Sequence, residues 1–145
     1  MITILCVGKI KENYLNEMIS DYKKRISKYE KIEIIEVKDN NDINKETEEL
    51  QKHINPRSFI ITLEIEGQKY SSEQFADIID KTHLTHSHIT FVIGSSNGLS
   101  EQIKKQANLA LSFSSFTFPH GLFRGILLEQ IYRANKINNN EVYHK

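Results

Sequence analysis

Short apolar segments alternate with stretches of helical periodicity along the whole chain, and this alternation constrains the fold more than any other feature. Segments 2–7, 59–65 and 89–93 are rich in β-branched residues and too short to be buried helices. Segment 32–37 alternates isoleucine and valine with glutamate, as a strand does. Because strands that alternate with helices pair in parallel, we predict an α/β fold with a parallel sheet and helices on both faces.

The segments between these strands predict helices and turns. Apolar side chains recur every three or four residues over positions 15–29, and a last helix is expected over about residues 122–136. Gly67 predicts a turn after the strand that precedes it. Segment 109–118 is expected to be extended.

Length and composition indicate one soluble domain over residues 1–145. With 39% hydrophobic and 26% charged residues, the chain buries a core without disulfides, which excludes the disordered and fibrous classes. The single cysteine, Cys6, lies in an apolar segment and fits a reducing compartment, so we expect a cytoplasmic protein. The short apolar run at the start has no basic region before it, so we expect neither a signal peptide nor a membrane span.

The charges are balanced overall but not along the chain. The net charge is zero, whereas residues 100–145 carry six lysines and arginines against three acidic residues. This excess permits a nucleic-acid partner without arguing for one, because nucleic-acid-binding domains normally carry a strongly basic face. An ordinary mixed surface is the simpler interpretation.

The last expected helix has more apolar surface than packing on one sheet needs. One apolar stripe is formed by Phe123, Leu127, Ile131, Ala134 and Ile137, and it is widened by Leu122, Ile126 and Leu128. Because the chain has one domain, the economical partner for this surface is a second copy of the chain. We therefore expect a homodimer through this helix, with complete burial inside one chain as the alternative.

Three loops are candidates for a ligand site, because open parallel sheets bind ligands at the carboxyl ends of their strands. They cover residues 63–67, 94–98 and 113–118. The middle loop, GSSNG, has glycines that let a ligand approach the backbone closely. It has neither the GxGxxG nor the GxxxxGK(S/T) phosphate-binding pattern, and a plain turn is an equally good interpretation.

No catalytic or metal-binding constellation stands out from the residues alone. His83, His86 and His88 are expected at the opposite pole from the three loops, without cysteine or carboxylate ligands beside them, so we expect no metal. A GxSxG nucleophile elbow is absent. The residues leave open an enzyme, a non-catalytic nucleotide- or RNA-binding α/β module, and a metal hydrolase that uses these histidines.

Six motifs, spread in order over the whole chain, carry a resemblance to a known family. They are VGK near the start, TLEIEGQ at 62–68, FVIGSSNGLS at 91–100, LSFSSFTFPH at 111–120, RxxLxEQIYRA at 124–134, and the terminal YHK. Together they resemble the RlmH family. Its members are SPOUT-class methyltransferases that methylate N3 of a pseudouridine in large-subunit (23S) ribosomal RNA, with S-adenosylmethionine as the methyl donor.

The resemblance implies a SPOUT-type fold with a C-terminal trefoil knot, in which the last helix threads through a loop that also holds the cofactor. It implies cofactor contacts in the three loops selected above, at Leu63, Gly94, Phe113, Ser114, Ser115, Phe116, Thr117 and Phe118. For the substrate it implies His144 as base or positioning residue, Tyr143 holding the tail, and Arg124 and Arg133 contacting RNA. The implied partner is large-subunit ribosomal RNA, and the weak net charge of the chain favours an assembled ribosomal surface over free RNA.

The chain differs from the family pattern at Ser95, where a second glycine is usual after Gly94. If the backbone there has a positive φ, a serine carries strain that a glycine does not.

Overall fold

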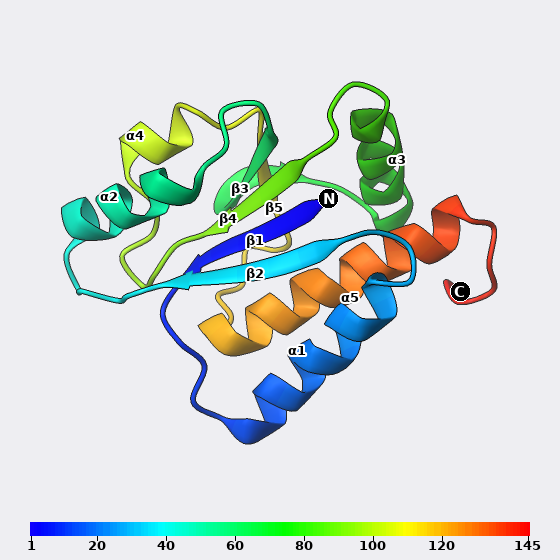
Figure 1. The fold of residues 1–145 in the computed structure, drawn as a ribbon, viewed down its shortest axis with the longest axis horizontal. Helices are drawn as coiled ribbons and strands as arrows, with labels where there is room; N and C mark the ends of the chain where they lie inside the picture. Colours follow the sequence, from blue (N-terminus) through cyan, green and yellow to red (C-terminus); the bar gives the residue numbers. More distant parts are fainter.

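The computed structural model describes residues 1–145, and its strands and helices alternate strictly along the chain (Figure 1). The strands are β1 (Ile2–Val7), β2 (Ile32–Val37), β3 (Phe59–Lys69), β4 (Ile89–Ile93) and β5 (Leu109–Ser112). The helices are α1 (Asn13–Ile26), α2 (Ile43–His53), α3 (Ser72–His83), α4 (Glu101–Lys104) and α5 (His120–Asn138). The strands form one sheet in the order β2-β1-β4-β3-β5, and every neighbouring pair is parallel. This confirms the predicted α/β class.

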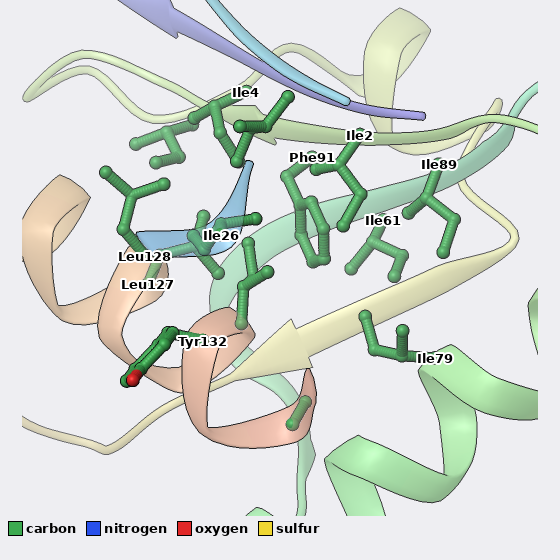
Figure 2. Close-up of a cluster of buried hydrophobic side chains, with 14 of the residues drawn as sticks. Ile2, Ile4, Ile26, Ile61, Ile79, Ile89, Phe91, Leu127, Leu128 and Tyr132 are labelled. Atoms are coloured by element: carbon green, nitrogen blue, oxygen red, sulfur yellow. The ribbon is translucent and has the colours of Figure 1, made fainter. Parts of the chain in front are cut away.

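The central strands bury both of their faces, which explains why their sequences read as continuous apolar runs. On one face, Ile4 and Phe91 pack in the larger core cluster with α1, α3 and α5 (Figure 2). On the other face, Leu5 and Val92 pack in a smaller cluster with side chains of α2 and α4. Helices therefore cover both faces of the sheet, as predicted.

The last helix, α5, packs against α1, α3 and the sheet, and this accounts for its apolar width. Leu127, Leu128 and Ile131 are fully buried inside the chain (Figure 2). Gly125 of α5 faces the flexible end of the Met18 side chain of α1, which would have to move if this residue carried a Cβ. Most of the surface that predicted a dimer is thus covered within one chain, which is the alternative given above.

Several element boundaries differ from the sequence prediction. The first helix ends at Ile26 because Ser27 starts a turn, in which its hydroxyl donates to the Lys24 carbonyl at 2.6 Å. The last helix is two residues longer at each end than expected. Beyond Ser112 the extended prediction is wrong. The backbone N–H of Phe116 donates to Ser114 Oγ at 3.0 Å, and such local side-chain bonds compete with strand pairing.

The turn predicted at Gly67 is also wrong, because β3 continues past it. Leu63 and Gln68 both pair with Leu111 of β5, so residues 64–67 bulge out of the ladder between them. A Cβ on Gly67 would lie 2.7 Å from the Ala110 carbonyl carbon and oxygen. The glycine therefore permits close packing of the bulge on β5. Among the five helices, none combines the length and apolar composition that crossing a bilayer requires.

Candidate functional site

A cavity of about 580 Å³ lies where β3, β4 and β5 end, and the three loops selected from the sequence converge on it. Leu63 and residues 64–66 of the β3 bulge form one wall, and the loop after β4 forms the second. The loop between β5 and α5 forms the third. The cavity is thus at the carboxyl edge of the sheet, where the topology predicts a ligand.

Seven of the eight predicted cofactor residues line this cavity. They are Leu63, Gly94, Phe113, Ser114, Phe116, Thr117 and Phe118. Ser115 does not line it, because its hydroxyl lies 2.7 Å from Lys69 Nζ and accepts a hydrogen bond from it. The lining is largely aromatic and aliphatic, with polar groups from the loop after β4.

Gly94 is required by the shape of its own loop. A Cβ at this position would lie 2.5 Å from the carbonyl oxygen of Gly98, because the loop folds back tightly on itself. The turn closes with a backbone hydrogen bond of 2.9 Å from Gly98 to Ser95. Gly98 has a φ of 74°, which favours glycine. The close approach of Gly98 therefore leaves no room for a side chain at position 94.

The serine that departs from the family pattern is free of the strain considered above. The only non-glycine residues with a positive φ are Asn41 and Asn140, so Ser95 lies in an ordinary backbone conformation. Its buried hydroxyl donates to Glu46 Oε1 of α2 at 2.7 Å. The backbone N–H of Asn97 donates to the same hydroxyl at 3.2 Å. Ser95 thus ties the cavity loop to α2.

Charged side chains line one side of the cavity. Glu64 and Glu66 come from the β3 bulge, and Lys104 comes from α4. The Thr62 hydroxyl donates to Glu64 at 2.6 Å, and Lys104 Nζ lies 3.9 Å from the same carboxylate. With two carboxylates against one ammonium group, this wall carries an excess of negative charge, which suits a ligand with a cationic centre.

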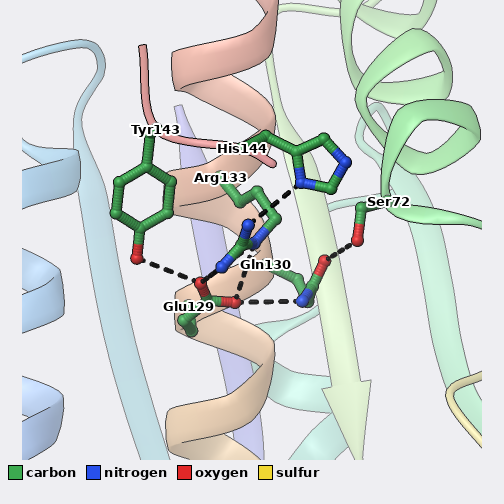
Figure 3. Close-up of polar contacts among 6 residues, drawn as sticks. All are labelled: Ser72, Glu129, Gln130, Arg133, Tyr143 and His144. Atoms are coloured by element: carbon green, nitrogen blue, oxygen red, sulfur yellow. Dashed lines mark hydrogen bonds and ion pairs between the residues drawn. The ribbon is translucent and has the colours of Figure 1, made fainter.

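A second, smaller cavity of about 260 Å³ adjoins the first, since Phe113 and Phe118 line both. Its polar end is formed by Ser72 of α3 and Gln130 of α5. The Ser72 hydroxyl donates to the Gln130 amide oxygen at 2.7 Å, and the amide nitrogen donates to Glu129 at 2.9 Å (Figure 3). The smaller cavity therefore extends from the first cavity to Gln130, which contacts Glu129 on α5.

The C-terminal tail is bound to α5, and three of the four predicted catalytic residues meet there (Figure 3). Arg133 Nη2 donates to Glu129 at 2.6 Å, and the Tyr143 hydroxyl donates to the same carboxylate at 3.1 Å. Arg133 Nη1 lies 3.0 Å from Nδ1 of His144. The ring of Tyr143 packs edge-on against Tyr132 at 4.9 Å. We define these residues, Glu129, Arg133, Tyr143 and His144, as the tail cluster.

The contacts within the tail cluster shift the pKa values of Tyr143 and Arg133. Burial, followed by the charge of Glu129, raises the pKa of Tyr143 to about 12. The hydrogen bond that Arg133 donates to Glu129 raises the pKa of Arg133 above its ordinary value. At neutral pH the tyrosine is therefore a hydrogen-bond donor, and the arginine a fixed cation.

Arg124, the fourth predicted catalytic residue, is not in the tail cluster. It is 2% exposed, and its Nη1 donates to Glu36 of β2 at 2.7 Å. Its Nη2 donates to the carbonyl oxygens of Gly8 at 3.2 Å and Val7 at 3.4 Å. This places Arg124 in an ion pair that joins α5 to the ends of β1 and β2. The guanidinium group of Arg124 is therefore not exposed for the RNA contact that was predicted for it.

The three histidines lie at the opposite edge of the sheet from the cavities, next to the start of β4, and each has a different neighbour. His83 Nε2 lies 3.0 Å from Glu30, and His88 Nε2 lies 2.7 Å from the hydroxyl of Thr3. His86 packs edge-on against Phe59. No group of three or more His, Cys, Asp or Glu side chains is arranged to hold a metal ion.

Two residues in or beside the tail cluster, Glu129 and Glu73, were not predicted from the sequence. Glu129 lies four residues before the predicted Arg133 on the same helix face, a spacing that favours an ion pair and is a signal in the sequence. Glu73, which lies 2.6 Å from Nε2 of His144, carries no such signal because it is 71 residues away in the chain. Only the fold brings α3 next to the tail.

The comparisons with known proteins cover the whole chain. Residues 1–144 match the family described as "Predicted SPOUT methyltransferase". A protein of Caldicellulosiruptor saccharolyticus named "Ribosomal RNA large subunit methyltransferase H" is 45% identical, and the match covers 100% of both chains. A protein of Clostridium botulinum (strain Kyoto) with the same name is 50% identical, with 99% of each chain covered.

Solved structures agree on the fold. A "probable methylase family protein" from Haemophilus influenzae superposes with a TM-score of 0.64 at 12% identity, over 99% of this chain and 70% of that chain. The SpoU methyltransferase AviRb of Streptomyces viridochromogenes, in complex with AdoMet, gives a TM-score of 0.51 at 10% identity, over 96% and 58%. The family match over residues 1–144 and the full-length relatives show that the chain belongs to the SPOUT methyltransferases and, within them, to the ribosomal RNA large subunit methyltransferase H family.

Proposed function

We propose that this protein transfers a methyl group from S-adenosylmethionine to N3 of a pseudouridine in large-subunit ribosomal RNA. The observation that carries the proposal is the convergence of seven predicted cofactor residues on one cavity at the carboxyl edge of the sheet. The names of the full-length relatives support the class of substrate. No observation favours a non-catalytic binding module, which stays the alternative.

The cavity suits S-adenosylmethionine in size and in chemistry. Its volume, about 580 Å³, is in the range of small-molecule sites. Leu63, Phe116 and Phe118 offer apolar walls for the adenine ring, and the loop at Gly94 offers backbone groups for hydrogen bonds. The carboxylates of Glu64 and Glu66 give a negative wall for a ligand that carries a sulfonium and an ammonium group.

When bound, S-adenosylmethionine supplies an electrophilic methyl group. The work of the protein is then to orient the nucleophile in line with that group and to exclude water. The nucleophile, an imide nitrogen, must also lose its proton, so a base with a pKa near neutrality is useful. In the tail cluster the imidazole of His144 is a side chain that can accept this proton, and Arg133 beside it offers a cation for the RNA.

His144 has both ring nitrogens engaged in this structure, one with Arg133 and one with Glu73. To accept the imide proton, the ring must first exchange its contact with Arg133 for one with the substrate. We therefore place Arg133 and His144 on the substrate side of the site, with Tyr143 anchoring the tail. Arg124 contributes to the fold.

The assembly and surroundings of the enzyme are also part of the proposal. Exposed apolar residues at the cavity rim, Phe116 at 78% and Ile65 at 52%, together with Leu122 at 37% on the first turn of α5, support a homodimer. The absence of net charge favours recognition of a shaped ribosomal surface over free RNA. A cytoplasmic location, inferred from the single cysteine, and the C-terminal trefoil knot, implied by the family resemblance, stay predictions.

Two measurements on the purified protein test the function. Methyl incorporation from radiolabelled S-adenosylmethionine is compared between ribosomes and naked ribosomal RNA that lack the modification, and we expect the ribosomes to be the better substrate. Calorimetric titration with S-adenosylmethionine, FMN and zinc should detect binding of the first only. Binding without methylation of either RNA would favour the non-catalytic module.

The cofactor site has a matched pair of test variants in one loop. Thr117→Arg places a long cation in the cavity, and we expect the affinity for S-adenosylmethionine to fall more than about tenfold. Ser115→Arg places the same side chain two residues away and outside the lining, and should change the affinity by less than about threefold. Equal affinities of the two variants would contradict the site. Gly94→Val is a poor test, because its side chain would collide with the Gly98 backbone.

A further inference from the structure

We propose that Glu73 is a positioning residue for the substrate side of the site, where its carboxylate and Arg133 together fix the tautomer of His144. The inference rests on the proposed function, since it gives Glu73 a part in the methyl transfer for which His144 is proposed. Glu73 lies in the first turn of α3, outside every motif that carries the family resemblance. Only its contact with the tail points to it.

Two contacts of the His144 ring determine where its proton lies. Arg133 Nη1 is 3.0 Å from Nδ1, and a guanidinium group can only donate, so Nδ1 accepts. Nε2 is 2.6 Å from Glu73 Oε1, and a carboxylate accepts, so Nε2 carries the hydrogen. A doubly protonated ring would turn an N–H toward the guanidinium group. The arrangement therefore holds a neutral imidazole whose basic lone pair is on Nδ1.

The carboxylate of Glu73 is well suited to this role at neutral pH. The backbone N–H at the start of α3, and after it the contact with His144, lower the pKa of Glu73. The group is therefore ionised and acts as an acceptor only. The other charged or titratable groups of the cluster are Arg133 and Glu129 on α5 and Tyr143 on the tail, so Glu73 is the single contribution from α3.

This geometry prepares His144 to take a proton from the substrate. A carboxylate that accepts from one imidazole nitrogen fixes the ring orientation and leaves the other nitrogen as the base. When the imide N–H of the target base replaces Arg133 at Nδ1, its proton moves to Nδ1 and its electron pair stays on N3. N3 then bonds to the methyl carbon as the sulfur–methyl bond breaks, and sulfur keeps the electron pair of that bond. The imidazolium ion that results lies beside the Glu73 carboxylate, which stabilises it until water removes the proton.

A simpler role for Glu73 is to stabilise the start of α3, where an acidic residue interacts favourably with the helix dipole. Three variants separate the two roles. Glu73→Asp keeps the charge in the first helical turn but is one methylene too short for the tail. Glu73→Ala removes both. Asp77→Ala, one turn further along α3, removes a carboxylate that pairs with Lys81 and does not touch the tail.

The test combines ribosome methylation with nitrogen NMR of ¹⁵N-histidine-labelled protein, in which the two ring nitrogens report the tautomer of His144. We expect the wild type to show the Nε2–H tautomer, and Glu73→Ala to show a mixture. Both Glu73 variants should lower kcat by about tenfold or more, with S-adenosylmethionine affinity unchanged. Asp77→Ala should match the wild type. Adding Glu73→Ala to His144→Ala should cause no further loss, because Glu73 acts through the imidazole.

Three outcomes would overturn the proposal. They are wild-type methylation by Glu73→Asp, additive losses in the double variant, and a His144 spectrum that does not change in Glu73→Ala. The NMR measurement needs no activity. A protein that shows the predicted tautomer but methylates no RNA would contradict the proposed function and leave the Glu73–His144 pair in place.

Discussion

Arg124 shows how a single residue changes its meaning once the fold is known. Its guanidinium group is buried and joins three chain segments through Glu36 and the carbonyl groups of Val7 and Gly8. Arg124→Ala leaves these acceptors without their donor, and we expect a loss of roughly 3 kcal/mol in the free energy of unfolding. Urea unfolding followed by circular dichroism measures it.

The matched control for Arg124→Ala is a substitution of its ion-pair partner, Glu36. Glu36 is one-third exposed, and Glu36→Gln keeps an oxygen that accepts from the guanidinium group, so its cost should be about 1 kcal/mol. If Arg124→Ala folds as stably as the wild type but loses methylation, the structural role of Arg124 would be wrong. The RNA contact predicted from the family resemblance would then be the better interpretation.

The burial of Cys6 predicts how the free energy of unfolding depends on pH. Burial, the largest cause, raises the pKa of its thiol from 9.0 to about 11, while Arg124 lowers it and Glu36 raises it. Below pH 9 the thiol is protonated whether the chain is folded or unfolded. Between pH 9 and pH 11 the unfolded chain loses this proton and the folded chain keeps it, so the free energy of unfolding falls by about 1.4 kcal/mol per pH unit.

The measurement for Cys6 is urea unfolding at pH 8 and pH 11, in the wild type and in Cys6→Ala. Other groups titrate in both proteins, so the difference between the two slopes isolates the thiol. We expect the wild type to lose about 2 kcal/mol more than the variant. Parallel slopes would mean that the thiol ionises equally in the folded chain.

At the scale of elements, the strands were the easiest part to predict. Both faces of β1 and β4 are buried, so their sequences are short continuous apolar runs. The continuation of β3 past Gly67 could not be predicted. It depends on the backbone of β5, which is distant in sequence and lies against the glycine. The same limit applies to the tail, whose contact with α3 leaves no periodic signal.

The cavity loops were predictable for a different reason. A topology rule selected them from the strand ends alone, and the structure brings residues of all three to one cavity. Which residues of a loop face the cavity is decided by local bonds, as the contact between Ser115 and Lys69 shows. Sequence therefore predicts the place of the site better than the members of its lining.

The tail is the element most open to a direct test. Removal of residues 143–145 deletes the aromatic anchor on Tyr132 and the imidazole beside Arg133, and leaves the cavity lining intact. We expect methyl transfer to fall by about a hundredfold or more. The affinity for S-adenosylmethionine, measured by calorimetry, should stay within about threefold of the wild type. Wild-type turnover by the shortened protein would show that the base lies elsewhere.

At the scale of the whole molecule, the exposed apolar residues near the cavity are the surface on which the proposed homodimer is tested. Leu128, on the surface that first predicted a dimer, is fully buried, so a charge there would unfold the chain without testing assembly. Leu122, also on α5, is 37% exposed and offers a surface that a second copy can cover. Leu84, 81% exposed after α3 at the opposite edge of the sheet, is an apolar residue outside the expected interface.

These two leucines form a matched pair for the homodimer. Multi-angle light scattering at micromolar concentration should give twice the mass of the 16.9 kDa chain for the wild type. Leu122→Asp should shift the mass toward the monomer, because an aspartate at a dimer interface loses its water without gaining a partner. Leu84→Asp should leave the dimer unchanged. A wild type that is monomeric across this range, or a Leu122→Asp variant as dimeric as Leu84→Asp, would contradict an interface at the start of α5.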